Sequence, residues 1–288
     1  MTANNDFNRS LSRIFTNPVF KQIAQSGSSD YFLSKLKKYD SLLSIEPGMQ
    51  VKNIIENAYG YLGKNYRNEY VYKNTILNNI LLGRHSLRTA TMLNEFKVCN
   101  SIADTVIING TSTVYEIKTE LDSPDKLEKQ IQDYKKAFAK IYLVTHHSLT
   151  HKYLSLIQGS TLGLLSLSGR FNLTVVKEAI EDYTCLCNDT MMKTLRKEEY
   201  TFIIRKYTGS VPNVSNIRFF SECILIARKI ESEVLHQLML EQLCKRIPAE
   251  SDFLESESLP RELKHICLCI NPNKKEYNNL FHFLTLNL

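Results

Sequence analysis

The stretch YEIKTELDSPDKLEKQIQDY, from Tyr115 to Tyr134, decides how the middle of this chain folds. Its first four residues alternate in polarity and predict a strand. Side chains two apart in a strand point to the same face, so Glu116 and Lys118 lie together with Ile117 opposite. An acid and an ammonium on one face belong either to the solvent side of an amphipathic strand or to half of an active site.

The second half of the stretch predicts a helix. Ser123 is a good N-cap, and Pro124 suits the first helical position. Gln130 and Tyr134 stand four apart and therefore share a helical face. Tyr134 also continues an apolar stripe that begins at Leu127, so it either contacts substrate or fills the core, and the sequence leaves both open.

The flanking sequence predicts a sheet around this stretch. Alternating or short apolar runs indicate strands at residues 95–99, 104–110, 113–120, 140–146, 162–169 and 171–179. NGTS, residues 109–112, reads as the hairpin turn between the second and third of these. The order strand, helix, strand after it implies a crossover, and therefore a parallel pair of strands.

The rest of the chain carries helical periodicity. Short helices are predicted in residues 1–60, and a longer one runs over 66–82 and ends at Gly83 in a left-handed conformation. Beyond residue 180 the strand signals fade and helices are predicted at 195–207, 216–247 and 276–286, with an acidic linker at 249–260. We expect three parts: a helical extension (1–60), an α/β core (61–180) and a helical C-terminal lobe (181–288).

Composition is typical of a folded domain, with 43% hydrophobic and 23% charged residues in 288. No apolar run approaches the roughly 18–20 residues that span a bilayer, and the N-terminus lacks the apolar segment of a signal peptide. We expect a cytoplasmic protein with no membrane partner.

The seven cysteines are odd in number and scattered, which does not resemble a disulfide framework. Two C-L-C pairs, Cys185/Cys187 and Cys267/Cys269, could supply four thiolates to one zinc ion. Their one-residue gap is shorter than that of most structural zinc sites, and small buried hydrophobes are the alternative interpretation.

The net charge of +6 is mild, but one basic stretch stands out. YGYLGKNYRNEYVYK, residues 59–73, interleaves five tyrosines with Lys64, Arg67 and Lys73. Aromatic rings for stacking beside cations for phosphate are what a nucleic-acid surface needs. A tyrosine-rich helix packed on a sheet, with its charges in water, is the alternative.

A third charged residue joins the central pair through the predicted hairpin. Asp104 opens the strand that precedes Glu116, and antiparallel pairing brings the two strands together, although the register is not fixed by sequence. Two converging carboxylates repel one another, and a divalent cation relieves that cost. Mg²⁺ favours such sparse carboxylate sites completed by water and phosphate, and Lys118 beside it could orient the attacking water.

This order of elements resembles the PD-(D/E)XK nuclease superfamily, which has a restriction-endonuclease-like fold. SIADTVIING and VYEIKTELDS are similar to an uncharacterised bacterial subfamily, and the resemblance covers residues 66–179. It implies that Asp104 and Glu116 bind the metal and that Lys118 is the catalytic lysine. The Q-x-x-x-Y pattern of Gln130 and Tyr134 is similar to a motif of RecB-like and phage exonucleases, where it is associated with the active site.

Members of this superfamily usually add a carboxylate from the first core helix. Glu69 shares a helical face with Ile76 and Ile80, so we expect its carboxylate to point toward the sheet, although Lys73 could simply pair with it. Glu95, expected to begin a strand, is the second candidate. Ala103 replaces the nominal proline before Asp104.

The sequence therefore predicts a Mg²⁺- or Mn²⁺-dependent deoxyribonuclease. Asp104, Glu116 and Glu69 would bind metal, and Lys118, Gln130 and Tyr134 would complete the catalytic site. A role in phage defence or mobile-element biology fits such an enzyme. The alternatives are an RNA or tRNA nuclease and a non-catalytic module that binds nucleic acid or protein. Self-association, or a protein partner on the C-terminal lobe, stays open.

Overall fold

The computed structural model describes residues 2–120 and 122–288, with residues 2–5 described by their backbone alone. The chain forms two compact units. One comprises the chain up to Arg84 together with Leu167–Leu173 and Pro248–Leu288, and the other comprises His85–Ser166 and Thr174–Ile247. The predicted division at residues 60 and 180 follows the sequence and stays a prediction, because these units join segments that are distant in sequence.

The first unit is helical in its described part. Its elements are α1 (Thr2–Ser12), α2 (Asn17–Ser26), α3 (Asp30–Lys38), α4 (Asp40–Leu43), α5 (Val51–Asn65), α6 (Glu69–Ile76), a π-helical segment (Leu77–Leu81), α7 (Leu82–Arg84), α14 (Ser251–Glu255), α15 (Lys264–Ile270) and α16 (Lys274–Thr285). The C-terminal α16 packs on α2 and α5, and the rings of Phe32 and Phe283 meet edge to face at 5.5 Å. The two ends of the chain therefore share one core.

The helix predicted over residues 66–82 is not a continuous α-helix. Its last turns are π-helical, and the N–H of Leu82 bonds to the carbonyl of Leu77. Gly83 lies inside α7 and does not adopt the predicted left-handed conformation. A Cβ at this position would approach the carbonyl oxygen of Asn78 to 3.0 Å, so close backbone approach is what favours glycine here.

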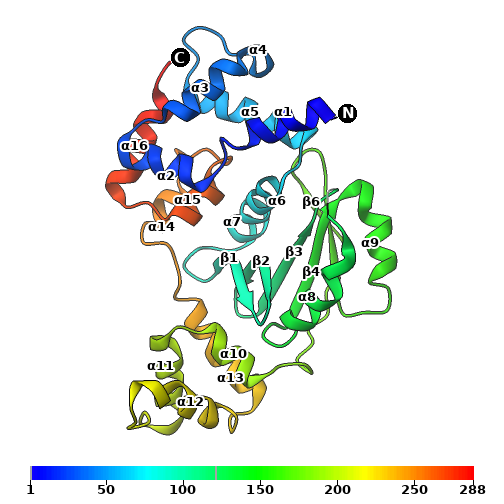
Figure 1. Cartoon of the computed structure of the whole chain (residues 1–288), viewed down its shortest axis with the longest axis vertical. Helices are drawn as coiled ribbons and strands as arrows, with labels where there is room; N and C mark the ends of the chain where they lie inside the picture. Colours follow the sequence, from blue (N-terminus) through cyan, green and yellow to red (C-terminus); the bar gives the residue numbers. More distant parts are fainter. Residues whose placement is uncertain (1, 121) are drawn as a thin grey trace. The chain divides into compact units, whose positions relative to one another are not determined.

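The second unit contains a six-stranded mixed sheet (Figure 1), which establishes the predicted α/β class. The strands lie in chain order: β1 (Thr91–Val98), β2 (Ser101–Ile108), β3 (Ser112–Lys118), β4 (Lys140–His146), β5 (Gly163–Leu167) and β6 (Leu173–Lys177). β1, β2 and β3 pair antiparallel, and β3 pairs parallel with β4. The predicted hairpin and crossover are confirmed, and Gly110 supplies the positive φ of the turn between β2 and β3.

Helices cover this sheet and extend its core. They are a 3₁₀ turn (Pro124–Lys126), α8 (Leu127–Tyr134), a second 3₁₀ turn (His147–Leu149), α9 (Thr150–Leu156), α10 (Asn188–Thr194), α11 (Lys197–Thr208), α12 (Asn216–Ala227) and α13 (Ser232–Leu243). α8 packs on β2, and α9 on β4. The apolar cluster under α8 continues into α10–α13, and all seven residues of β3 are buried.

Two predictions for the C-terminal region need correction. The helix predicted over 216–247 is broken between Ala227 and Ser232, where the chain turns so that α12 and α13 can both pack on α10. The predicted linker at 249–260 contains α14, whose Leu254 is buried. Among the described residues, no helix combines the length and the apolar character that crossing a bilayer requires.

Candidate functional site

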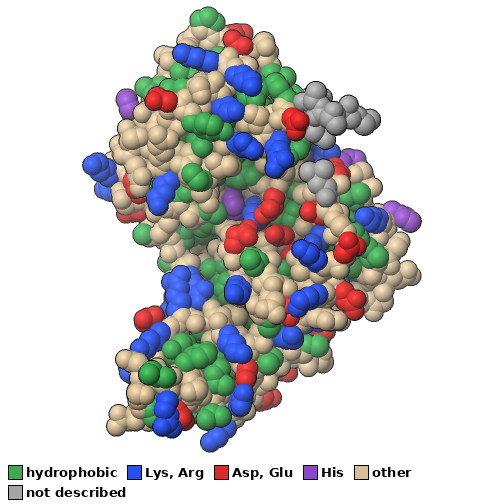
Figure 2. Space-filling model, in the orientation of Figure 1, with side chains coloured by type: hydrophobic (Ala, Val, Ile, Leu, Met, Phe, Trp, Pro, Cys, Tyr) green, Lys and Arg blue, Asp and Glu red, His purple; other side chains and the backbone are tan. Residues whose placement is uncertain are grey.

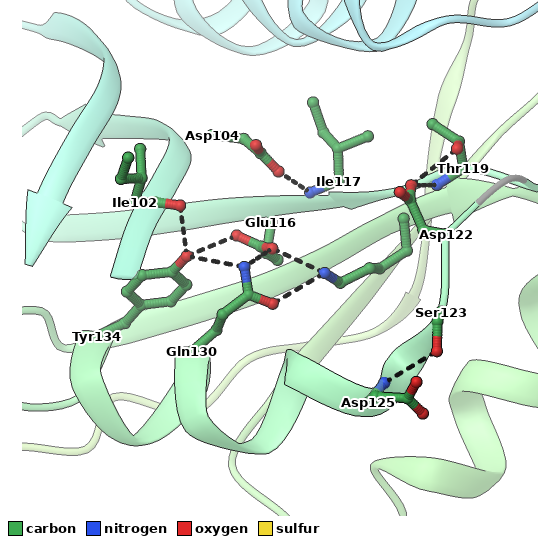
Figure 3. Close-up of polar contacts among 11 residues, drawn as sticks. Ile102, Asp104, Glu116, Ile117, Thr119, Asp122, Ser123, Asp125, Gln130 and Tyr134 are labelled. Carbon is green, nitrogen blue, oxygen red and sulfur yellow. Dashed lines mark hydrogen bonds and ion pairs between the residues drawn. The ribbon is translucent and has the colours of Figure 1, made fainter. Parts of the chain in front are cut away.

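The site lies where β2 and β3 separate. Their ladder ends at the pair Thr105 and Tyr115, and beyond it β2 continues beside β1 while β3 continues beside β4. Asp104 stands at this fork, and its Oδ2 accepts the backbone N–H of Ile117 at 2.7 Å (Figure 3). The carboxylate thus replaces the backbone carbonyl that would accept this N–H in a continuous ladder, and this bond fixes it where the two strands separate.

Glu116 and Lys118 follow on the face of β3 that α8 covers. Lys118 Nζ donates to Glu116 Oε1 at 2.9 Å and to Gln130 Oε1 at 3.0 Å. The amide of Gln130 closes the triangle by donating to Glu116 Oε1 at 2.6 Å. Glu116 is 2% exposed and Lys118 6%, so the interpretation of these residues as the solvent side of an amphipathic strand is wrong.

Tyr134 holds the other oxygen of Glu116. Its ring is fully buried, and its hydroxyl lies 2.9 Å from Glu116 Oε2 and 2.7 Å from the carbonyl oxygen of Ile102 on β2 (Figure 3). Of the two interpretations left open by the sequence, packing in the core is confirmed, because full burial leaves the ring no surface for a substrate. Tyr134 fills the core, and its hydroxyl ties β2 to the carboxyl group on β3.

Burial sets the protonation of this network. It raises the pKa of Glu116, and the ammonium of Lys118 offsets the rise in part. Burial and then the negative charge of Glu116 raise the pKa of Tyr134, so this phenol keeps its proton. The phenol has one proton, so at any moment it donates either to Glu116 Oε2 or to the carbonyl of Ile102.

A second carboxylate approaches Asp104 from β1. Asn94 pairs with Thr105 and Phe96 with Ala103, which places Glu95 opposite Asp104. Glu95 has φ +51°, in the left-handed region, which a non-glycine residue adopts at a cost of about 1–3 kcal/mol. Carboxylate oxygens of Glu95 and Asp104 lie within 4.8 Å of one another. Glu95 lies in the interior of β1, contrary to the expectation that it begins the strand.

The other predicted metal ligand, Glu69, belongs to the first unit. It is the first residue of α6, and its carboxylate pairs with Lys73, as the alternative interpretation held. Its side chain is 53% exposed. This exposure places the side chain partly in water, and the expectation that its carboxylate points toward the sheet stays a prediction.

The three cations of the predicted nucleic-acid surface also lie in the first unit, and they differ in environment. Lys64 is exposed near the end of α5. The guanidinium of Arg67 donates to the carbonyl oxygens of Gly63 and Lys64 at 3.4 and 3.0 Å. Lys73 is buried, so its ammonium is committed to Glu69 within this unit.

Two features of the site have no signal in the sequence, the role of Ile102 and the backbone conformation of the candidate ligand Glu95. Ile102 contributes only a backbone carbonyl, which no side-chain pattern reveals. Glu95 was weighed below Glu69, and its left-handed backbone opposite Asp104 has no sequence signal, because glutamate is not a residue that favours this conformation.

A family model and a curated relative agree on one family. The family model described as bacteriophage P4 protein cII matches residues 63–266, and the chain belongs to this family. Protein cII of Enterobacteria phage P4 is 25% identical over 220 residues, which cover 73% of this chain and 76% of that protein.

Among solved structures, a protein of unknown function from Silicibacter pomeroyi is similar over 43% of this chain and 85% of its own length. The identity is 14% and the TM-score 0.29.

Proposed function

We propose that this member of the phage P4 cII family is a metal-dependent nuclease that hydrolyses phosphodiester bonds in DNA. One observation carries the proposal: a buried lysine and glutamate are bonded to each other at the fork where a second strand presents a carboxylate. Lys118 and Glu116 form the buried pair, and Asp104 stands at the fork. On this proposal the sheet is a restriction-endonuclease-like core of the PD-(D/E)XK superfamily.

The donor groups suit a hard divalent cation. Asp104 and Glu95 bring carboxylate oxygens within 4.8 Å, and Mg²⁺ or Mn²⁺ binds such oxygens while keeping water and phosphate ligands. Asp104 and Glu116 would hold the ion, with Glu95 as the third carboxylate. A bound ion would act as a Lewis acid on the phosphoryl oxygens and lower the pKa of a bound water.

Three side chains of the site would assist the attack on the phosphodiester. The ammonium of Lys118 can donate a hydrogen bond to the attacking water and offset the negative charge that builds on the phosphoryl group. Gln130 Oε1 accepts a hydrogen bond from Lys118 Nζ at 3.0 Å and so orients the ammonium, and the hydroxyl of Tyr134 fixes the direction of the Glu116 carboxyl group. Gln130 and Tyr134 are therefore positioning residues, and full burial keeps Tyr134 away from any substrate.

The first unit would contribute phosphate contacts. Lys64 is exposed and Arg67 lies two residues before the start of α6, so both could meet a DNA backbone. Lys73 would do so only after leaving its ion pair with Glu69. A role in phage defence or mobile-element biology fits a nuclease of this family.

A cleavage assay tests the proposal. Purified protein is incubated with plasmid, single-stranded DNA and RNA, each with Mg²⁺, with Mn²⁺ and with EDTA. We expect DNA cleavage that needs metal and falls at least about 100-fold in Lys118→Ala. Cleavage that survives this substitution would refute the catalytic assignment, and cleavage of RNA alone would favour an RNA or tRNA nuclease.

Burial of Glu116 and Lys118 favours one other candidate, a module that binds nucleic acid without cutting it. Gel shifts separate the two. A binding module would retard DNA in EDTA and show no cleavage with either metal. Its Asp104→Ala variant would bind DNA with the same affinity as the unmodified chain.

A further inference from the structure

The helical part of the second unit exposes an unusual share of apolar side chains. Of the fourteen large hydrophobic residues that are exposed in the described chain, seven lie between residues 188 and 247. Figure 2 shows apolar side chains gathered over this part, with Lys and Arg side chains spaced around them. Exposed apolar groups concentrated in this way mark interaction surfaces.

The charges of the same segment are not balanced within it. Residues 188–247 contain ten Lys and Arg against seven Asp and Glu. Four of the cations are paired with four of the acids: Lys206–Glu241, Arg218–Glu222, Arg228–Asp189 and Arg246–Glu199. The six other cations, which include Arg205 and Lys245, form no direct ion pair within the described residues. Three acids of the segment also lie outside these four pairs, so ten cations against seven acids leave it a net charge of +3, which suits an anionic partner.

An aromatic ring lies among these cations. Phe202 on α11 is 45% exposed, and Lys245, just beyond α13, holds its ammonium 4.5 Å from the centre of the ring. Arg205 stands three residues from Phe202 and is exposed on the same helical face. Lys206 bonds to Glu241 of α13 at 2.8 Å, which fixes α11 and α13 as one surface.

We propose that Phe202, Arg205 and Lys245 form a binding surface for single-stranded nucleic acid. An unpaired base would stack on the ring of Phe202, and the two cations would contact the flanking phosphates. Stacking beside phosphate contacts is how proteins hold single strands without reading their sequence. A protein partner fits less well, because the buried centre of protein interfaces is depleted of lysine. This surface acts independently of the proposed cleavage centre.

Fluorescence anisotropy in EDTA tests the surface without cleavage. The full chain is titrated against labelled oligo-dT, oligo-rU and a duplex of equal length at several salt concentrations. We expect single strands to bind more tightly than the duplex, and Phe202→Ala to weaken binding about tenfold. Lys245→Ala and Arg205→Ala should each reduce the slope of log Kd against log salt by about one.

The chain offers a matched control. Tyr31 in the first unit is 39% exposed and carries the ammonium of Lys35 at 5.4 Å from its ring. Tyr31→Ala removes a comparable aromatic–cation pair and should leave binding unchanged.

Three results would overturn the proposal. The first is that Phe202→Ala and Lys245→Ala bind as tightly as the unmodified chain. The second is that Tyr31→Ala weakens binding as much as Phe202→Ala does. The third is that sedimentation shows self-association that Phe202→Ala abolishes while oligonucleotide binding persists, which would make the face a protein interface. Because binding is read in EDTA, loss of the proposed nuclease activity alone would not affect this outcome.

Discussion

The two ends of β3 are buried alike, but they differ in charge. At the first end Ser112 Oγ accepts the N–H of Ala139 at 3.0 Å and bonds to Nε2 of His236 at 2.9 Å. At the last end a carboxyl group and an ammonium, Glu116 and Lys118, are bonded to each other. The first end is a neutral link between β3, the chain before β4, and α13.

The difference in charge between the two ends of β3 indicates which buried polar group belongs to a functional site. Both ends are hydrogen-bonded, so satisfied polar atoms alone do not distinguish them. A buried ion pair contributes little to stability, and neutral side chains of similar volume often replace it without loss. Stability therefore does not explain Glu116 and Lys118, whereas it does explain Ser112 and His236. We expect substitutions at one end to affect catalysis and at the other to affect folding.

The largest effect should come from replacing the charged pair with a neutral one. Glu116→Gln/Lys118→Met removes both charges together, so no charge is left buried alone. We expect cleavage to fall at least about 100-fold and the free energy of unfolding to change by less than about 1 kcal/mol. Urea unfolding and the cleavage assay measure the two quantities on the same preparation.

Ser112→Ala is the reciprocal test. It leaves the N–H of Ala139 and Nε2 of His236 without their partner, and should lower the free energy of unfolding by about 2 kcal/mol while the cleavage rate stays unchanged. If Ser112→Ala impairs cleavage as strongly as the double variant does, the distinction between the two ends of β3 is lost.

The neutral end should also show a pH dependence. Burial lowers the pKa of His236 from 6.5 to about 4, and the nearby carboxylate of Glu181 offsets part of this shift. As pH falls below 6.5 the unfolded chain binds a proton that the folded chain does not, so stability declines until about pH 4. This one group should lower the free energy of unfolding by about 2 kcal/mol between about pH 8 and pH 5.

Denaturant unfolding across this pH range, with His236→Gln for comparison, measures the contribution. The variant should lose this part of the pH dependence and keep the rest. Equal pH profiles for the two proteins would show that His236 titrates normally in the fold.

The smallest effect is expected at Tyr134. Tyr134→Phe removes the hydroxyl that lies between Glu116 and the carbonyl of Ile102, and should lower the free energy of unfolding by about 1.5 kcal/mol. Tyr153 is equally buried, and its hydroxyl has no hydrogen-bond partner within the described residues. Tyr153→Phe should therefore cost nothing. If the free energy of unfolding falls equally in the two variants, the hydrogen bonds of the Tyr134 hydroxyl do not contribute to stability.

The local parts of the site could be predicted from sequence. Residues two apart in a strand and four apart in a helix share a face whatever the tertiary structure, which is why Glu116, Lys118, Gln130 and Tyr134 were grouped correctly. The N-cap at Ser123 is also a local feature, because serine is a favoured residue type just before a helix, and its hydroxyl accepts the N–H of Asp125.

The remainder depends on contacts that no local pattern contains. The point where β2 and β3 separate, and with it the position of Asp104, follows from strand register. The left-handed backbone of Glu95 is imposed by its place in the sheet, and the packing of α16 on α2 joins residues far apart in sequence. Such long-range contacts override local propensity.

Diffraction from crystals soaked in Mn²⁺ tests the central claim most directly, because manganese scatters anomalously and can be located without bias. The account predicts a peak bounded by the carboxylates of Asp104 and Glu116 that disappears in Asp104→Asn. No peak at the fork in crystals that bind manganese elsewhere, or a peak there that persists in Asp104→Asn, would contradict it.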